Sequence, residues 1–341
     1  MMLTTEVSED HKVLIDKQYV GELKGLKFII DFTSKNLDAD LKSIKKAARK
    51  GVEKELVKRV KTIIEKKDLS VDFENKIVWR NDPVAKIKKG EDYLRPDIEI
   101  IADDALPDDE KKELEYFLKS WINIHINEVL ADLINLTKIK IENQYLRALS
   151  YQLYENNGVL KRKNIDEIIK LISKDERKKL WSMGIKIGRY HIFLPKMLKP
   201  KAVLLRTTLW KIYNNISSSL AIPQFGLNFV QNKNYNEKFL LLCGFERFKD
   251  YFIRIDILEK LFLNIIDATV DRRFKISPQM MNLLGCTKEN FFNLMSLMSY
   301  KKSKDSDTYY FSSNIKKDKG KLAPNKNKVN PFSKLLALNI K

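Results

Sequence analysis

The sequence has few of the residues that build metal centres, disulfide scaffolds or dithiol redox sites. Its 341 residues include three histidines and two cysteines, Cys243 and Cys286, with no Cys-x-x-Cys pair. This scarcity argues against a zinc site of standard spacing and a disulfide-stapled fold, and it fits a reducing compartment. We therefore expect a cytoplasmic protein without a bound metal.

Long apolar runs and phosphate-binding loops are also missing. No window approaches 18 consecutive apolar residues, and residues 1–10 do not read as a secretory signal. The nearest approach to a Gly-x-x-x-x-Gly-Lys-[Ser/Thr] loop is Gly320-Lys321-Leu322, near the C-terminus. The sequence thus predicts no membrane association, no ATP site and no cofactor, and it does not support an enzyme that works alone.

Positive charge, by contrast, is abundant. Lysine and arginine total 64 against 45 acidic residues, a net charge of +19, and hydrophobic residues make up 44% of the chain. The hydrophobic content is sufficient for real cores. The charge favours polyanionic partners, and nucleic acid is the partner we expect.

Short apolar strands and longer helical stripes predict an α+β fold that is predominantly helical. We expect small β-rich N-terminal parts, a helical bundle, winged-helix-like units and a disordered basic tail. The predicted divisions are a β-rich region with one long basic helix at 1–105, a basic helical and winged-helix-like unit at 106–213, a second winged-helix-like unit at 238–312, and the tail at 313–341.

Local patterns also predict several individual helices and strands. A long helix is predicted from Asp38 to about Lys67, and its residues from Asp40 to Lys67 have a net charge of +7, from 11 basic and 4 acidic residues. Another helix is predicted to end at Asn156-Asn157-Gly158. We predict one strand at Ile185–Leu194, and a strand pair at Phe239–Cys243 and Tyr251–Ile255.

The strongest local signal for nucleic-acid binding is the basic and aromatic segment 178–201. Basic side chains bind phosphates, and aromatic rings stack on unpaired bases. The alternative is that the rings are core residues and the lysines merely solvated. The candidate nucleic-acid-binding residues are Lys161, Arg162, Lys163, Lys186, Arg189, Tyr190, Lys196, Lys199, Lys201, Arg272 and Arg273.

Two other functions stay open from the residues alone. The acidic stretch Arg95–Glu115 and the apolar element Pro331–Leu338 could dock a partner, which would make the chain a protein-interaction scaffold. A deep pocket lined by carboxylates or by His191 would instead indicate an enzyme. No catalytic residue is singled out by a motif.

Several short motifs occur in an order that is similar to a known family and that spans nearly the whole chain. They include Val20–Phe28, Leu94-Arg95-Pro96, Trp121–Ile126, Gly188–Pro195, Arg254–Glu259, Leu284–Thr287 and Pro331–Leu338. In this order they resemble the C-terminal, post-motor region of bacterial superfamily-2 helicases related to the mitochondrial degradosome RNA helicase. The resemblance implies an accessory region that binds RNA or another single-stranded nucleic acid.

The resemblance also implies a motor. In that family ATP is used by two RecA-like domains, which have no counterpart among the motifs of this chain. The implied motor is therefore a helicase partner in trans, or one that the chain has lost. The alternative is a scaffold that docks a helicase or another protein.

Overall fold

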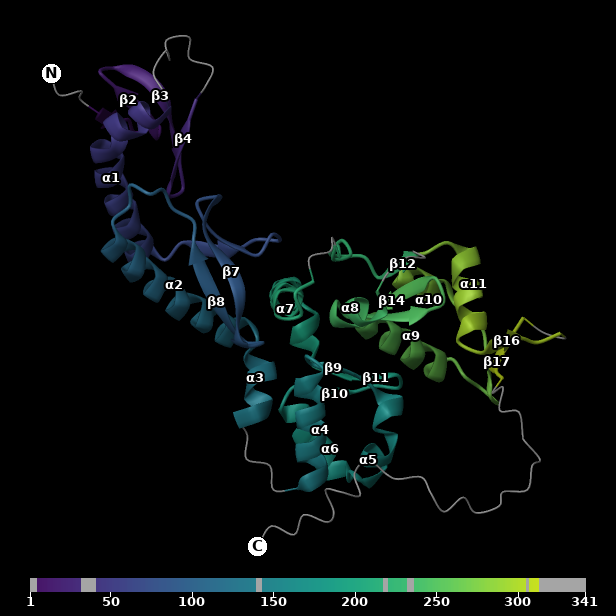
Figure 1. The fold of residues 1–341 in the computed structure, drawn as a ribbon. Coiled ribbons are helices and arrows are strands. Elements are labelled where there is room, and N and C mark those ends of the chain that lie inside the picture. The colour runs from purple at the N-terminus through teal and green to yellow at the C-terminus, as the bar shows by residue number, and fades with distance from the viewer. Residues whose placement is uncertain are drawn as a thin grey trace, which may run out of the picture.

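A computed structural model gives the fold of the chain (Figure 1). It describes residues 5–31, 41–138, 143–216, 220–231, 236–304 and 307–312. The fold is mixed, with 48% helix and 26% strand, and the strands form several small antiparallel sheets. The predicted combination of helices and small sheets is confirmed. The predicted helix start at Asp38 and the predicted basic tail lie outside the described residues.

The N-terminal module consists of two antiparallel four-stranded meanders, each followed by a helix. In both sheets the strands are hydrogen-bonded in chain order. The first half contains β1 (Thr5–Val7), β2 (Lys12–Ile15), β3 (Gln18–Lys24), β4 (Lys27–Ile30) and α1 (Leu41–Lys66). The second half contains β5 (Leu69–Val71), β6 (Lys76–Trp79), β7 (Asp82–Asp92), β8 (Arg95–Ile100) and α2 (Asp108–Val129).

The two halves of this module share one hydrogen-bonding register, which makes the module an internal repeat. Val13 pairs with Gly21, and Ile77 pairs with Ala85, so each partner recurs 64 positions later. A register shift follows both pairs, at Val13/Leu14 and at Ile77/Val78. Both meanders therefore have the same bulge at the same place.

The second half differs from the first by a longer hairpin between β7 and β8. Its tip contacts the C-terminal module: the Tyr93 hydroxyl donates to the Arg206 carbonyl oxygen at 3.1 Å, and the Lys89 ammonium lies 5.0 Å from the Tyr213 ring centre. Helix α2 packs on β8 and completes the second half. The predicted boundary after residue 105 therefore falls between β8 and α2, which are packed together.

The C-terminal module repeats one topology three times, after the short connecting helix α3 (Ala131–Lys138). In each unit the last strand lies between the other two. The first unit contains α4 (Gln144–Glu155), β9 (Val159–Lys161), α5 (Asp166–Leu171), α6 (Lys174–Ser182), β10 (Lys186–Ile187) and β11 (His191–Phe193). The second contains α7 (Pro200–Tyr213), β12 (Phe229–Gln231), α8 (Glu237–Leu242), β13 (Phe245–Phe248) and β14 (Tyr251–Arg254). The third contains α9 (Ile255–Asp267), β15 (Arg273–Phe274), α10 (Pro278–Leu284), α11 (Lys288–Leu297), β16 (Tyr300–Lys302) and β17 (Tyr309–Phe311).

Two predicted strands of this module are wrong. The stretch Ile185–Leu194 is two strands rather than one, because the chain turns at Gly188, whose N–H donates to the His191 carbonyl oxygen at 2.8 Å. In the segment Phe239–Cys243 the first four residues belong to α8 and Cys243 is its C-cap, and the Asn236 side chain caps the start of this helix by accepting from the Phe239 N–H. A short apolar run fits a buried strand and a buried helical turn equally well, so its pattern does not separate the two.

A fully buried arginine joins the units at the centre of the C-terminal module. Arg206 of α7 donates hydrogen bonds to the backbone carbonyl oxygens of Asn157, Met197 and Leu242. Burial lowers the pKa of Arg206 to about 10. Asn157 and Gly158 have positive φ just after α4, so the predicted helix end is confirmed.

Among the described helices, none combines the length and the apolar character needed to cross a membrane.

Candidate nucleic-acid interface

The tip of the β10–β11 hairpin is held in place by one carboxylate. Glu259 of α9 accepts backbone N–H groups from Arg189 at 2.6 Å, Tyr190 at 2.9 Å and His191 at 3.0 Å. A β-carbon at Gly188 would lie 2.3 Å from the Glu259 carboxyl carbon, so a larger residue there would displace this carboxylate from the hairpin. The third unit thereby fixes where the hairpin of the first unit points.

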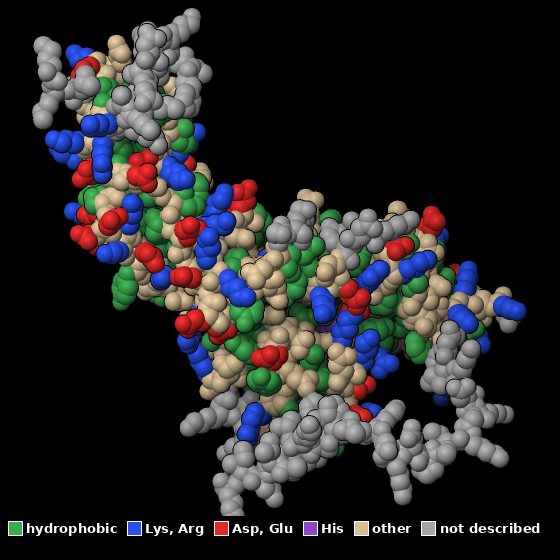
Figure 2. Space-filling model, viewed as in Figure 1, with side chains coloured by type: hydrophobic (Ala, Val, Ile, Leu, Met, Phe, Trp, Pro, Cys, Tyr) green, Lys and Arg blue, Asp and Glu red, His purple; other side chains and the backbone are tan. Residues whose placement is uncertain are grey.

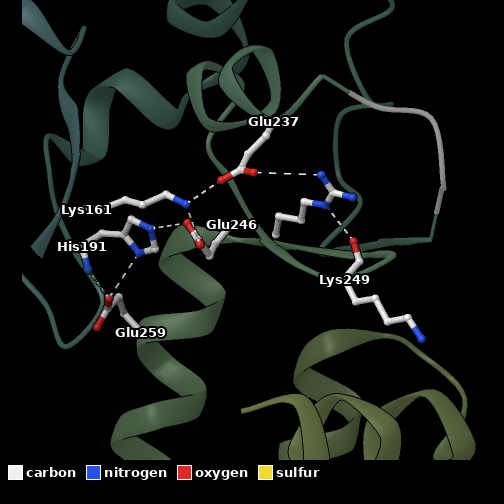
Figure 3. Close-up of polar contacts among 7 residues, drawn as sticks. Lys161, His191, Glu237, Glu246, Lys249 and Glu259 are labelled. Carbon is white, nitrogen blue, oxygen red and sulfur yellow. Dashed lines mark hydrogen bonds and ion pairs between the residues drawn. The ribbon is translucent and has the colours of Figure 1, made fainter. Parts of the chain in front are cut away.

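A buried charged network lies behind this hairpin (Figure 3). The His191 ring is 1% exposed; its Nε2 is 2.7 Å from a Glu246 oxygen and its Nδ1 is 3.7 Å from a Glu259 oxygen. The Lys161 ammonium lies 3.0 Å from Glu246 and 2.9 Å from Glu237. The network links β9 and β11 of the first unit to elements of the other two.

The network favours the charged form of each of its members. Burial alone would lower the pKa of His191, but the two carboxylates outweigh burial and raise it. Burial opposes ionisation of Glu246 and Glu259 as well, yet the pKa of each is lowered by His191, with help from Lys161 at Glu246 and from backbone N–H groups at Glu259. The cluster is therefore a set of mutually compensated charges.

In front of the hairpin lies a cavity of about 650 Å³, which we call the aromatic hollow. Tyr190 meets the rings of Phe248 and Phe262 edge-on, at centroid distances of 6.4 and 5.8 Å. The hollow collects rings from all three units and two arginines. Its aromatic and basic lining residues are Arg189, Tyr190, Phe248, Phe262, Arg272, Phe274, Tyr300 and Phe311.

A second cavity of about 320 Å³, the basic hollow, adjoins the first. Both are lined by Arg189 and Phe262, and the Arg189 guanidinium carbon lies 5.6 Å from the Phe262 ring centre. The other charged lining residues are Arg162, Lys186, Asp256, Glu259 and Lys260.

The acidic residues of the basic hollow already have partners. Asp256 accepts from Arg254 at 2.7 and 3.0 Å, and Glu259 is engaged by the hairpin. Lys186 and Lys260 are exposed, and no described carboxylate lies within ion-pairing distance of either. The hollow therefore presents net positive charge next to a wall of aromatic rings.

Five of the sequence-predicted residues come together at the two hollows although they are far apart in the chain. Arg189 lines both, Tyr190 and Arg272 line the aromatic hollow, and Arg162 and Lys186 line the basic hollow. Arg162 is partly committed, because it pairs with Asp166 at 2.9 Å and donates to the Gly188 carbonyl oxygen.

The other six predicted residues line neither hollow. Lys161 is held in the buried network, and Lys196 pairs with Asp132 at 2.9 Å. The remaining four are exposed elsewhere on the C-terminal module, and these are Lys163, Lys199, Lys201 and Arg273.

The residues that sequence reasoning missed are those that complete the hollows from α9 and β17. Phe262 belongs to an apolar stripe that predicts only core packing, and Lys260 is a single basic residue on a mixed helix. Phe311 is 55% exposed, a property that no local pattern indicates.

Neither a metal-binding cluster nor a similar known protein helps to assign a function to these hollows. The described residues contain no group of three or more histidine, cysteine or acidic side chains arranged to hold a metal ion. Comparisons with protein-family models, curated proteins and solved structures found no match. Any functional conclusion therefore depends on the two hollows.

Proposed function

We propose that the chain binds single-stranded nucleic acid across the two hollows. Unpaired bases stack on the rings of the aromatic hollow, and the neighbouring phosphates lie against Lys186, Arg189 and Lys260. The observation that carries the proposal is the shared wall of Arg189 and Phe262, which sets a cation beside an open aromatic surface. Proteins that bind single strands combine these two features.

The shape of the C-terminal module supports a bound strand. Each unit has a helix, a strand, one or two helices and a hairpin, with the first strand against the last, and this is the order of a winged-helix unit. The hollows lie where the hairpin of the first unit meets α9 of the third. A nucleic-acid strand bound there would contact two units at once. It would run along the junction between the units, which favours a single strand over a duplex.

Two substitutions test this proposal with a labelled eight-nucleotide single-stranded RNA, measured by fluorescence anisotropy over a salt series. Phe311→Ala removes a stacking surface and is expected to weaken binding about 5- to 100-fold. Arg189→Gln is expected to weaken binding and to lower the salt slope by about 0.7.

The matched controls are an exposed ring and a pair of exposed lysines outside the hollows. Phe73→Ala removes a ring that is 66% exposed in the N-terminal module. The double substitution Lys199→Gln and Lys201→Gln removes two charges from the segment 178–201, which the sequence predicts to bind nucleic acid. If these controls weaken binding and the hollow variants do not, the strand does not lie in the hollows.

A protein partner is the competing occupant, because α9, which lines both hollows, and the segment just after it carry exposed apolar side chains. Leu263 is 57% exposed, Ile266 49% and Val270 72%. A protein docked there would depend little on salt, whereas a nucleic acid is released as salt rises. The resemblance to RNA helicases makes RNA the first probe. A helicase motor in trans is tested by copurification with and without nuclease.

A further inference from the structure

The outer face of α1 carries a continuous row of lysines. Lys46, Lys50, Lys54, Lys58 and Lys61 are all exposed and follow one another at intervals of four, four, four and three residues. At about 100° per residue they occupy roughly a third of the helix circumference, over a length of about 22 Å. We call these five residues the lysine ridge.

The five ridge lysines form no ion pair with a described residue. No described carboxylate lies within 4.0 Å of any of the five ammonium groups, whereas Glu55 on another side of α1 pairs with Arg59. Like charges four residues apart destabilise a helix by about 0.2–0.5 kcal/mol per pair. Two carboxylates border the row: Glu53, three residues after Lys50, and Glu65, four residues after Lys61.

The internal repeat shows that the fold itself does not require these lysines. The core stripe of α1 at Val52, Leu56 and Val60 corresponds to Leu114, Leu118 and Ile122 of α2, 62 positions later. By the same offset the five ridge positions correspond to exposed residues of α2 that include one lysine. These are Asp108, Lys112, Tyr116, Ser120 and Asn123.

We propose that the lysine ridge is a second nucleic-acid contact, which binds the phosphate backbone of a duplex. Duplex DNA carries one phosphate per about 1.7 Å of its axis, counting both strands, so the five ammonium groups face a dense array of phosphates over about 22 Å. The ridge contains no aromatic ring and lines neither hollow, so we expect it to bind phosphates by charge alone. Figure 2 shows lysine and arginine side chains over the part of the N-terminal module where α1 lies.

An anionic membrane is the other polyanionic surface, and α1 is not built to enter one. Peripheral helices insert an apolar face into the lipid boundary. The apolar face of α1 is already in the protein core, where Ala48, Val52, Leu56, Val60 and Ile63 are at most 1% exposed. None of the exposed large hydrophobic side chains of the described residues belongs to α1.

The test is binding of a blunt 20-base-pair duplex to the full chain, measured over a salt series. The ridge variant is Lys50→Gln, Lys54→Gln and Lys58→Gln. The control variant removes the same charge from exposed strand positions of the same module, at Lys12→Gln, Lys27→Gln and Lys86→Gln. We expect the ridge variant to bind at least tenfold more weakly, with a salt slope reduced by about 2–3, and the control to bind as the wild type does.

The eight-nucleotide single strand separates this proposal from the previous one. It should bind the ridge variant with wild-type affinity, which also shows that the variant is folded. If no protein binds the single strand but the ridge variant alone loses the duplex, the hollows fail and the ridge stands. Equal loss in both lysine variants, an unchanged duplex affinity, or binding to phosphatidylserine vesicles without duplex binding would overturn the ridge proposal.

Discussion

The two ends of the molecule present positive charge in different ways. In the C-terminal module two cations of the hollows are held by specific neighbours: Arg189 lies over Phe262, and Arg162 is tied to Asp166 and to the hairpin. In the N-terminal module the lysine ridge is a row of free ammonium groups on a smooth helix face. The first arrangement can select the form of a ligand, whereas the second can only add affinity.

The contrast shows which parts of a basic protein are informative about its ligand. Net charge alone indicates a polyanion, but it does not separate single strands from duplexes. A cation fixed beside rings does make that distinction, because stacking requires unpaired bases. Substitutions can test whether binding in the hollows depends on the position of single groups and whether binding at the ridge depends only on the number of charges.

The largest effect is expected where the hairpin is anchored. Glu259→Ala leaves three backbone N–H groups without their acceptor and removes one of the two carboxylates beside the buried His191 ring. We expect the free energy of unfolding of the C-terminal module to fall by about 3 kcal/mol in urea denaturation. Single-strand binding should fall with it, while duplex binding at the ridge persists. Glu74→Ala, at an exposed turn, is the control and should change neither.

The next effect depends on pH. Because its carboxylate partners raise the pKa of His191, its stabilising contribution is complete below the ordinary value of about 6.5 and is lost as pH rises through the higher folded-state value. The pKa of Glu246 and that of Glu259 are lowered, so their contributions are lost only under acidic conditions. The other charged groups facing this ring are Lys161 and, beyond it, Glu237.

We therefore expect the unfolding free energy to decline in the wild type as pH rises above the ordinary histidine value of about 6.5. His191→Gln keeps a hydrogen-bonding group but removes the charge, so it should cost about 2 kcal/mol at pH 6 and flatten the decline. An equally steep decline in His191→Gln would assign the pH dependence to another group.

A smaller effect is expected at the contact between the modules. Tyr93→Phe removes the hydroxyl that donates to the Arg206 carbonyl oxygen at 3.1 Å, which should cost about 1 kcal/mol. Short probes should bind each surface as before. A duplex with a single-stranded extension should bind a few-fold more weakly, because linkage of the two sites becomes looser. Unchanged affinity for that probe would mean that the surfaces act separately.

The smallest effect is expected for one ridge lysine. Lys54→Gln should weaken duplex binding only a few-fold and lower the salt slope by about 0.9. A loss as large as that of the triple variant would contradict a ridge that acts by charge count, since it would make Lys54 a specific contact.

Local patterns predicted the elements with strong periodicity. The stripe at Val52, Leu56 and Val60 indicates α1, and Asn157-Gly158 marks the end of α4. The same reasoning misassigned Phe239–Cys243, because α8 is too short for its period to be read. The internal repeat escaped detection because its halves share a hydrogen-bonding register but few residues.

The candidate site was predictable only in part. Arg189 and Tyr190 stand out in a basic and aromatic segment, but nothing local places Arg272 beside them. Lys161 looks equally basic in the sequence, yet Glu237 and Glu246 neutralise it from 76 and 85 positions away. Tertiary packing decides which cations remain available to a ligand. The pattern of charges along the sequence does not predict these long-range ion pairs.

The most direct test of the account locates the bound strand. A 4-thiouridine-labelled eight-nucleotide RNA is photo-crosslinked to the full chain, and the modified peptides are identified by mass spectrometry. The account predicts crosslinks at the rings of the aromatic hollow, above all Tyr190, Phe262 and Phe311, and their loss in Arg189→Gln. Crosslinks confined to α1 or to the segment 196–201, with none at the hollow, would contradict it.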